Sequence, residues 1–227
     1  MTAAGDPSPV AVGDAPRVET RVERKERTRR AILDAALDLS GETSLVGVSL
    51  RQVAKEVGIV PTGFYRHFDS IESLGLALVD ESFASLRAML RDVRQIDRQD
   101  PEKPFASIVD HSVRVLADHV ERQHQHFLFI ARERAAGPRA VREAIRHEIG
   151  LCERELAADL ALLPGTTRWS SEDFRNISNL IVTSMVATAE ALIAAGDDVE
   201  AREQICAAAR TQLRMVIVGA LHWRANV

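Results

Sequence analysis

Residues 49–68, SLRQVAKEVGIVPTGFYRHF, place the start and stop signals of a helix very close together. Ser49 and Gln52 have the spacing of a capping box, which favours a helix that begins just after Ser49. Gly58 suits the left-handed residue that follows a helix end, so this helix has only about nine residues. Pro61 then suits the first position of another helix, where its missing N–H is not needed. A helix this short is not stable alone, so the segment must pack as part of a helical corner.

The segment that Pro61 opens has two chemically different sides. At 100° per residue, Phe64 and Phe68 fall on the same side, beside Pro61. The residues that fall on the opposite side or toward its flank are polar, small or amphipathic, namely Thr62, Gly63, Tyr65, Arg66 and His67. We therefore expect one buried face and one face that is free to contact something else.

Residues 21–40 supply a third helix for this corner, charged at first and then amphipathic. The apolar residues available for a shared core are Ile32, Leu39, Leu50, Val53, Ala54, Val57, Phe64 and Phe68. A helix, a turn with glycine and a second helix form the unit whose second helix enters the major groove of DNA. The spacing alone is also compatible with an ordinary helical corner.

The rest of the chain also favours helix, because it is rich in Ala, Leu, Glu and Arg. Asp69 and Glu72 repeat the capping spacing, which predicts a long helix to about Ile96. Further helices are predicted at about 105–122, 125–135, 139–163, 171–195 and 199–222. We predict an all-α chain of about nine helices. It would comprise a disordered tail (1–20), a helix-turn-helix head (21–70) and a body for ligand binding and dimerisation (71–227).

Charge separates the head from the remainder of the chain. Residues 17–67 contain ten Lys and Arg against seven acids, whereas the whole chain has a net charge of −4. This asymmetry favours a polyanionic partner for one end only. The predicted DNA surface comprises Ser49, Arg51, Pro61, Thr62, Gly63, Tyr65, Arg66 and His67. Thr62 and Gly63 allow close approach to base edges and Arg66 can reach them, whereas the others are placed for phosphates.

Two stretches carry a family resemblance. TRRAILDAALDLS and SLRQVAKEVGIVPTGFYRHFDSIESL resemble the signature of the TetR family of bacterial transcriptional regulators. The resemblance implies a homodimer with a three-helix DNA-binding head and a body that binds a small ligand. It implies phosphate contacts from Tyr65 and His67, and groove-facing positions for Thr62 and Gly63. Pro61 stands where many relatives have a polar residue.

Three further pieces are similar to the FabR/DesT group of that family: PTGFYRHFDSIESLGLALVDES, RERAAGPRAVREAIRHEI and LRMVIVGALHW. Members of this group repress unsaturated fatty-acid synthesis and sense long-chain acyl thioesters. The resemblance therefore implies a repressor of lipid-metabolism genes whose effector is an acyl-CoA. A drug or steroid-like effector on the same scaffold is the first alternative, and a helical interaction module without a DNA role is the second.

The apolar residues that can line an effector pocket are Phe105, Ile108, Phe127, Ile130 and Met185, although residues at this spacing also form ordinary cores. Charged residues Arg132, Glu133 and Arg134 can contact the phosphates of an acyl thioester or form a solvated surface. The helices at 171–195 and 199–222 are expected to form a four-helix dimer interface. The apolar stripes proposed for it are Leu180, Met185, Ala189, Leu192 and Ile193, and Leu213, Val216, Ile217 and Ala220.

Other classes of function find little support. The sequence contains no P-loop, HExxH or GxSxG motif and no GxGxxG after a strand, so we expect no enzyme, no catalytic residues and no cofactor. His119, His124 and His126, with Asp118 nearby, do not share one helical face, so no metal site is expected. Residues 180–196 are too polar for a comfortable membrane span. With free thiols at Cys152 and Cys206 and no signal peptide, we expect a cytoplasmic protein.

Overall fold

The computed structural model describes residues 20–94, 104–163 and 166–223, and the side chains of 91–94 and 104–106 are excluded from this description. Within those ranges the chain forms nine helices and no strands, as predicted. The predicted tail lies outside the described residues except for Thr20. Thr20 caps the first helix through a capping box with Glu23.

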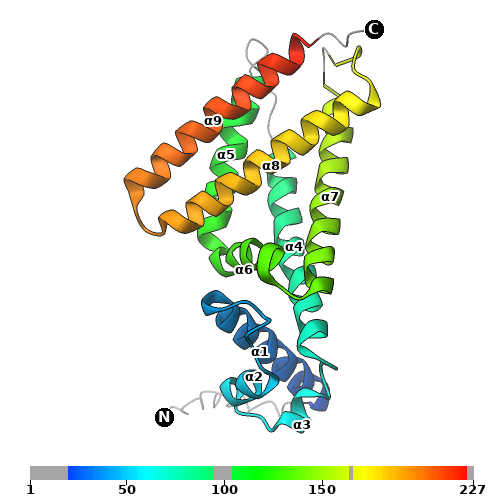
Figure 1. The fold of residues 1–227 in the computed structure, drawn as a ribbon, viewed down its shortest axis with the longest axis vertical. Coiled ribbons are helices and arrows are strands. Elements are labelled where there is room, and N and C mark those ends of the chain that lie inside the picture. The colour runs from blue at the N-terminus through cyan, green and yellow to red at the C-terminus, as the bar shows by residue number, and fades with distance from the viewer. Residues whose placement is uncertain (1–19, 95–103, 164–165, 224–227) are drawn as a thin grey trace, which may run out of the picture.

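Three helices form the head at the lower end of the molecule (Figure 1): α1 (Arg21–Glu42), α2 (Leu50–Val57) and α3 (Pro61–Phe64). The residues predicted to begin and end α2 do so in the structure. The backbone N–H of Gln52 donates to the Ser49 hydroxyl over 3.2 Å. Gly58 ends the helix with a φ of 73°, a left-handed conformation that favours glycine. The sequence therefore specifies both ends of α2.

The segment after α3 continues as turns rather than as helix. α3 has four residues, and residues 65–67 form a turn in which the His67 N–H donates to the Phe64 carbonyl over 2.8 Å. The capping pair of the next helix was predicted one residue too early. Ser70 and Ser73 cap each other's backbone N–H groups over 3.0 Å, and the helix begins at Ile71. Asp69 and Glu72 have the same spacing as a capping pair, but the capping hydrogen bonds are formed by Ser70 and Ser73.

Six helices form the body: α4 (Ile71–Arg94), α5 (Pro104–Arg122), α6 (His124–Ala136), α7 (Arg139–Ala161), α8 (Ser171–Ala195) and α9 (Val199–Leu221). Figure 1 shows α8 and α9 side by side as an antiparallel pair, with α7 crossing α8 and α4 descending to the head. The predicted helices in this region match these bounds to within about two residues, which is the usual uncertainty of helix ends.

One apolar core joins the head to the body. We call it the head core: it comprises buried residues of α1–α4 and the α1–α2 turn, together with Phe129 of α6 and Val141 and Ile145 of α7. The approach is close at Gly75, where a Cβ would lie 2.7 Å from Leu45 and 2.9 Å from Val141. The predicted boundary at residue 70 therefore runs through a continuous core.

Helix α8 carries unusually apolar surface. Its length and composition would allow it to cross a membrane, contrary to the expectation that residues 180–196 are too polar, and 22% of its most apolar stretch is buried within the chain. The buried side packs against α5, α6, α7 and α9. The remaining apolar surface needs a partner or a ligand to cover it.

Candidate functional site

The α3 segment shows the two faces that the sequence predicted. Phe64 is fully buried and Phe68 is nearly so, whereas Tyr65 is 59% exposed. The rings of Phe64 and Phe68 pack at 5.9 Å between centroids, and Arg29 of α1 lies 5.1 Å above the Phe68 ring. These contacts fix the segment against α1, so that Tyr65 and Arg66 point into solvent.

His67 occupies a half-buried position among cations. Its pKa is lowered mainly by burial, then by the charges of Lys25 and Arg29, while Glu26 acts in the opposite sense. Its Nδ1 is buried and has no hydrogen-bond partner among the described residues. A neutral imidazole can still donate one N–H. Burial is thus the main cause of the lowered pKa of His67, and the neighbouring cations of α1 add to it.

The remaining predicted DNA residues lie in α2 and α3 or at the start of α2. Pro61 and Thr62 are exposed and Gly63 is half-buried. Arg51 is exposed on α2. Ser49 is exposed, but its hydroxyl accepts from the Gln52 N–H and donates to the Gln52 side chain over 2.8 Å. Its capping role therefore uses the hydroxyl that was assigned to a phosphate.

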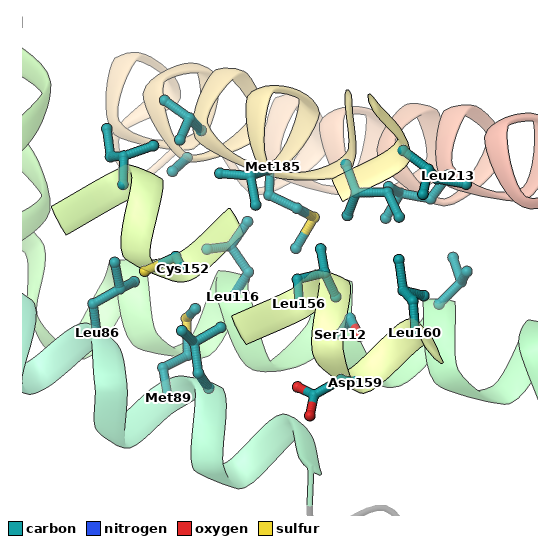
Figure 2. A pocket seen from close by; sticks show the side chains of 18 of the residues that line it. Leu86, Met89, Ser112, Leu116, Cys152, Leu156, Asp159, Leu160, Met185 and Leu213 are labelled. Atoms are coloured by element: carbon teal, nitrogen blue, oxygen red, sulfur yellow. The ribbon is translucent and has the colours of Figure 1, made fainter. Parts of the chain in front are cut away.

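A cavity of about 420 Å³ lies in the body, within the size range of small-molecule sites. Its wall includes four of the five predicted pocket residues, Ile108, Phe127, Ile130 and Met185. Phe105 belongs to the stretch whose side chains are outside the described set. In Figure 2, the side chains of Met185 and Leu156 point toward one another across this space.

The cavity is long and apolar. On α8 its wall includes a residue every fourth position from Ile177 to Ile193, a distance of about 24 Å at 1.5 Å per residue. We call this largely apolar cavity, whose wall extends along most of α8, the channel. The polar side chains in the wall are few, chiefly Ser112, Arg134, Asp159, Thr166 and Glu190. Burial raises the pKa of the Cys152 thiol to about 11, so this wall residue is uncharged.

Two of the three charged residues that were predicted as possible contacts for ligand phosphates form hydrogen bonds with the head instead. Glu133 is fully buried and accepts from the backbone N–H of Leu45 over 3.0 Å and from the Ser44 hydroxyl over 3.1 Å. Arg132 donates to the Ser40 carbonyl over 2.7 Å. These partners could not be predicted from the sequence, because they lie about ninety positions away on the α1–α2 corner. Arg134 does line the cavity.

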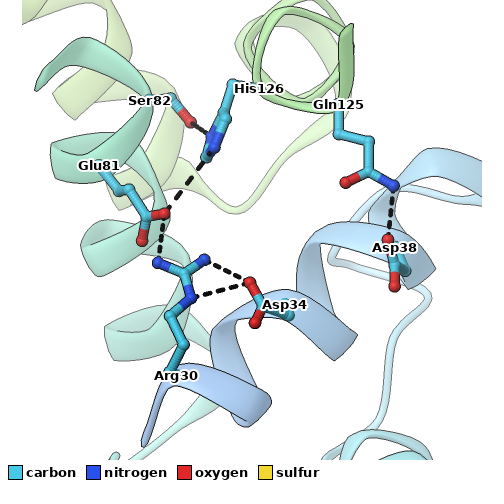
Figure 3. Close-up of polar contacts among 7 residues, drawn as sticks. All are labelled: Arg30, Asp34, Asp38, Glu81, Ser82, Gln125 and His126. Carbon is cyan, nitrogen blue, oxygen red and sulfur yellow. Dashed lines mark hydrogen bonds and ion pairs between the residues drawn. The ribbon is translucent and has the colours of Figure 1, made fainter. Parts of the chain in front are cut away.

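More polar contacts join α1, α4 and α6 (Figure 3). Arg30 of α1 pairs with both Asp34 and Glu81, and His126 of α6 lies 3.1 Å from the Ser82 hydroxyl. Gln125 donates to Asp38 over 2.6 Å. In the described parts of the chain, the metal-binding residue types do not gather in groups of three.

The proposed dimer stripes are largely wrong in detail. Leu192 and Leu213 are buried inside the protomer, and Met185, Ile193 and Ile217 line the cavity. Of the predicted residues, Leu180 on α8 does face outward, 52% exposed, whereas the exposed apolar residues of α9 are Met215 and Val218, 68% and 57% exposed, which were not in the predicted stripe. Both the inward and the outward side of each helix carry apolar residues. The spacing of apolar residues in the sequence therefore did not show which side faces outward.

One family model matches most of the head and the start of α4. Residues 32–78 match the family model for bacterial regulatory proteins of the tetR family. This range includes most of α1, the whole of α2 and α3, and the first turns of α4.

Solved structures show the same fold over most of the chain. A transcriptional regulator from Rhodococcus sp. Rha1 is 19% identical, with a TM-score of 0.61 over 86% of this chain and 99% of its own. The fatty acid degradation regulator FadR from Bacillus halodurans is 14% identical, with a TM-score of 0.63 over 87% and 97%. A TetR transcriptional regulator from Legionella pneumophila is 14% identical, with a TM-score of 0.61 over 88% and 98%. The fold is that of transcriptional regulators.

Proposed function

We propose that this chain, a helix-turn-helix regulator with a tetR-family head and the fold of such regulators, is a dimeric, ligand-responsive repressor. The observation that carries the proposal is the division of the α3 segment. Phe64 and Phe68 anchor it, while Thr62, Tyr65 and Arg66 remain exposed beside the basic start of α1. The family match disfavours an interaction module without a DNA role. Such a soluble regulator would act in the cytoplasm.

The exposed face has the chemistry for both kinds of DNA contact. Thr62 and Gly63 let the segment approach base edges closely, and Arg66 supplies a long donor. Tyr65, His67 and Arg51 can donate to phosphates and fix the register. Because phosphate contacts release counterions, affinity for the operator should fall steeply as salt rises.

Replacing Tyr65 or Thr62 by Ala should each weaken operator binding about tenfold, the cost of one lost hydrogen bond to a phosphate or a base edge. A gel-shift titration against DNA flanking the chain's own gene measures this. Leu162→Ala, which truncates an exposed side chain at the far end of α7, is the matched control. If either head variant instead lost its thermal unfolding transition, the residue would belong to the core rather than to the DNA surface.

The effector proposed for the cavity is an extended apolar chain, as in a long-chain acyl thioester. A cavity whose wall extends about 24 Å along α8 suits such a chain better than it suits a compact drug or steroid-like molecule. The similarity in fold to a fatty acid degradation regulator agrees with this, although at 14% identity it concerns the fold alone. Mass spectrometry of organic extracts from the purified protein tests the assignment, and a polycyclic compound would overturn it.

Filling the channel should block the effector and spare DNA binding. Ala189→Phe places a ring in the cavity wall, and we expect at least about tenfold weaker binding of hexadecanoyl-CoA. Operator affinity without ligand should be unchanged. Ala84→Phe adds the same ring to an exposed position of α4 and should leave both affinities unchanged. Calorimetric titration measures the first affinity and gel shift the second.

Two helices connect the channel to the head. Helix α4 runs between them, with Leu78 in the head core and Met89 in the cavity wall. Helix α6 presents Phe127 and Ile130 to the channel and Glu133 to the α1–α2 corner. A ligand that shifts these helices would change the spacing of two heads and so the operator affinity. A coupling of about 1–3 kcal/mol would give about 5–150-fold regulation.

A further inference from the structure

A second hollow, of about 360 Å³, lies between α6, α7 and α8, directly beside the channel. The two spaces share five wall residues: Arg134, Ile149, Val182, Val186 and Glu190. The shared residues include the ion pair between Arg134 and Glu190, whose atoms lie 3.3 Å apart. Both side chains of this pair are more than a third exposed, so the pair stands at the boundary between the apolar channel and solvent.

The second hollow is basic, unlike the channel. Its wall contains Arg134, Arg142 and Arg146 against one acid, Glu190, a balance of +2. The ion pairs formed among the described residues leave out Arg142 and Arg146. The nearby Glu143 influences them only at longer range, because it is paired with Arg139 over 2.8 Å.

Arg142 is positioned without being neutralised. Its Nη1 donates to the Gly137 carbonyl over 2.6 Å, which orients the guanidinium, while Glu143 attracts its positive charge at longer range. Arg146 lies one turn further along the same face of α7. Guanidinium groups arranged in this way suit phosphate oxygens, which accept paired N–H donors.

We infer that this basic hollow holds the phosphate-bearing headgroup of the effector whose apolar chain fills the channel. The inference rests on the proposed apolar-chain effector and adds the chemistry of its other end. A single carboxylate needs only one guanidinium, whereas three arginines match a group with several negative charges. The headgroup would displace Glu190 from Arg134, since both anions compete for the same guanidinium.

The test compares the binding of hexadecanoyl-CoA and hexadecanoate to the full-length protein. Wild type should bind the thioester at least about tenfold more tightly, with a stronger dependence on salt. The double variant Arg142→Gln/Arg146→Gln should lose about tenfold or more for the thioester and less than about twofold for hexadecanoate. Arg139→Gln, on the same helix but outside the hollow, should change neither affinity.

Each result separates this inference from the proposed function. Equal affinity of wild type for the two ligands, or equal loss for both in the double variant, would overturn the headgroup site while leaving an apolar-chain effector in place. Failure of wild type to bind either ligand would overturn the effector class itself, even with operator binding intact. If the double variant does not fold, the wild-type preference and its salt dependence still decide the question.

Discussion

Replacing Met215 by Glu should separate the two protomers and lower affinity for a two-half-site operator by about 10²–10⁴-fold, the usual contribution of bivalence. Met215 is 68% exposed in one protomer and lies one turn from Val218, which is 57% exposed. With Leu180 on α8 they give the outward sides of the two helices apolar surface that a partner would be expected to cover. A buried, unpaired carboxylate in such an interface is costly.

Sedimentation velocity and gel shift measure the two effects together. Ser107→Glu adds the same charge to an exposed position of α5, outside the proposed interface, and should leave both properties unchanged. A Met215→Glu protein that stayed dimeric would show that the interface lies elsewhere. A monomer with undiminished operator affinity would contradict the bivalent binding mode.

The geometry of the pair α8–α9 explains why this surface should be an interface. The two helices pack antiparallel, and their inward sides are already used by the channel and by contacts with α5 and α7. A two-fold axis through the outward sides would bury Leu180, Met215 and Val218 against their own copies. It would also present two α3 segments to one side of the dimer, as a palindromic operator requires.

Local rules predicted the head well because its decisive signals are close in sequence. These signals act within a few residues: Ser49 with Gln52 begins α2, Gly58 ends it, and Pro61 begins α3. The same rules misplaced the start of α4. Two overlapping pairs, Asp69–Glu72 and Ser70–Ser73, satisfy the capping spacing, and only the second forms its hydrogen bonds. Spacing alone does not choose between them.

Features that depend on distant packing could not be predicted. Leu192 and Leu213 have the period of an interface stripe, but they face the inside because α5 packs there. The basic hollow depends on Arg134, Arg142 and Arg146 meeting across two helices beside α8. Each arginine resembles an ordinary surface charge in the sequence. The channel residues were found more readily, because large apolar side chains in amphipathic helices must be buried against something.

Glu133 should be the acid on which the junction between head and body most depends. Its carboxylate accepts from Leu45 N–H and the Ser44 hydroxyl, and a Cβ on Gly137 would lie only 2.5 Å from it. Glu133→Ala removes both acceptors and leaves a buried backbone N–H unpaired. We expect a loss of about 3 kcal/mol in the free energy of unfolding, whereas Glu143→Ala on the surface should leave it nearly unchanged.

Glu133→Gln separates the hydrogen bonds from the charge. Burial raises the pKa of the Glu133 carboxyl above its ordinary value of 4.5, although the Leu45 N–H, the Ser44 hydroxyl and Arg132 act to lower it. The folded protein therefore binds this proton more tightly than the unfolded chain. The resulting stability is fully present below about pH 4.5 and is lost as pH rises through the folded pKa.

The amide of Glu133→Gln keeps an acceptor for Leu45 and carries no charge at any pH. This variant should therefore match wild type near pH 4.5 and exceed it in stability above the folded pKa, where wild type must bury a carboxylate. Denaturant unfolding at pH 4.5 and pH 8 measures the difference. A Gln variant as destabilised as the Ala variant at pH 8, but not at pH 4.5, would mean that the carboxylate's charge, rather than its acceptor oxygens, holds the α1–α2 corner to α6.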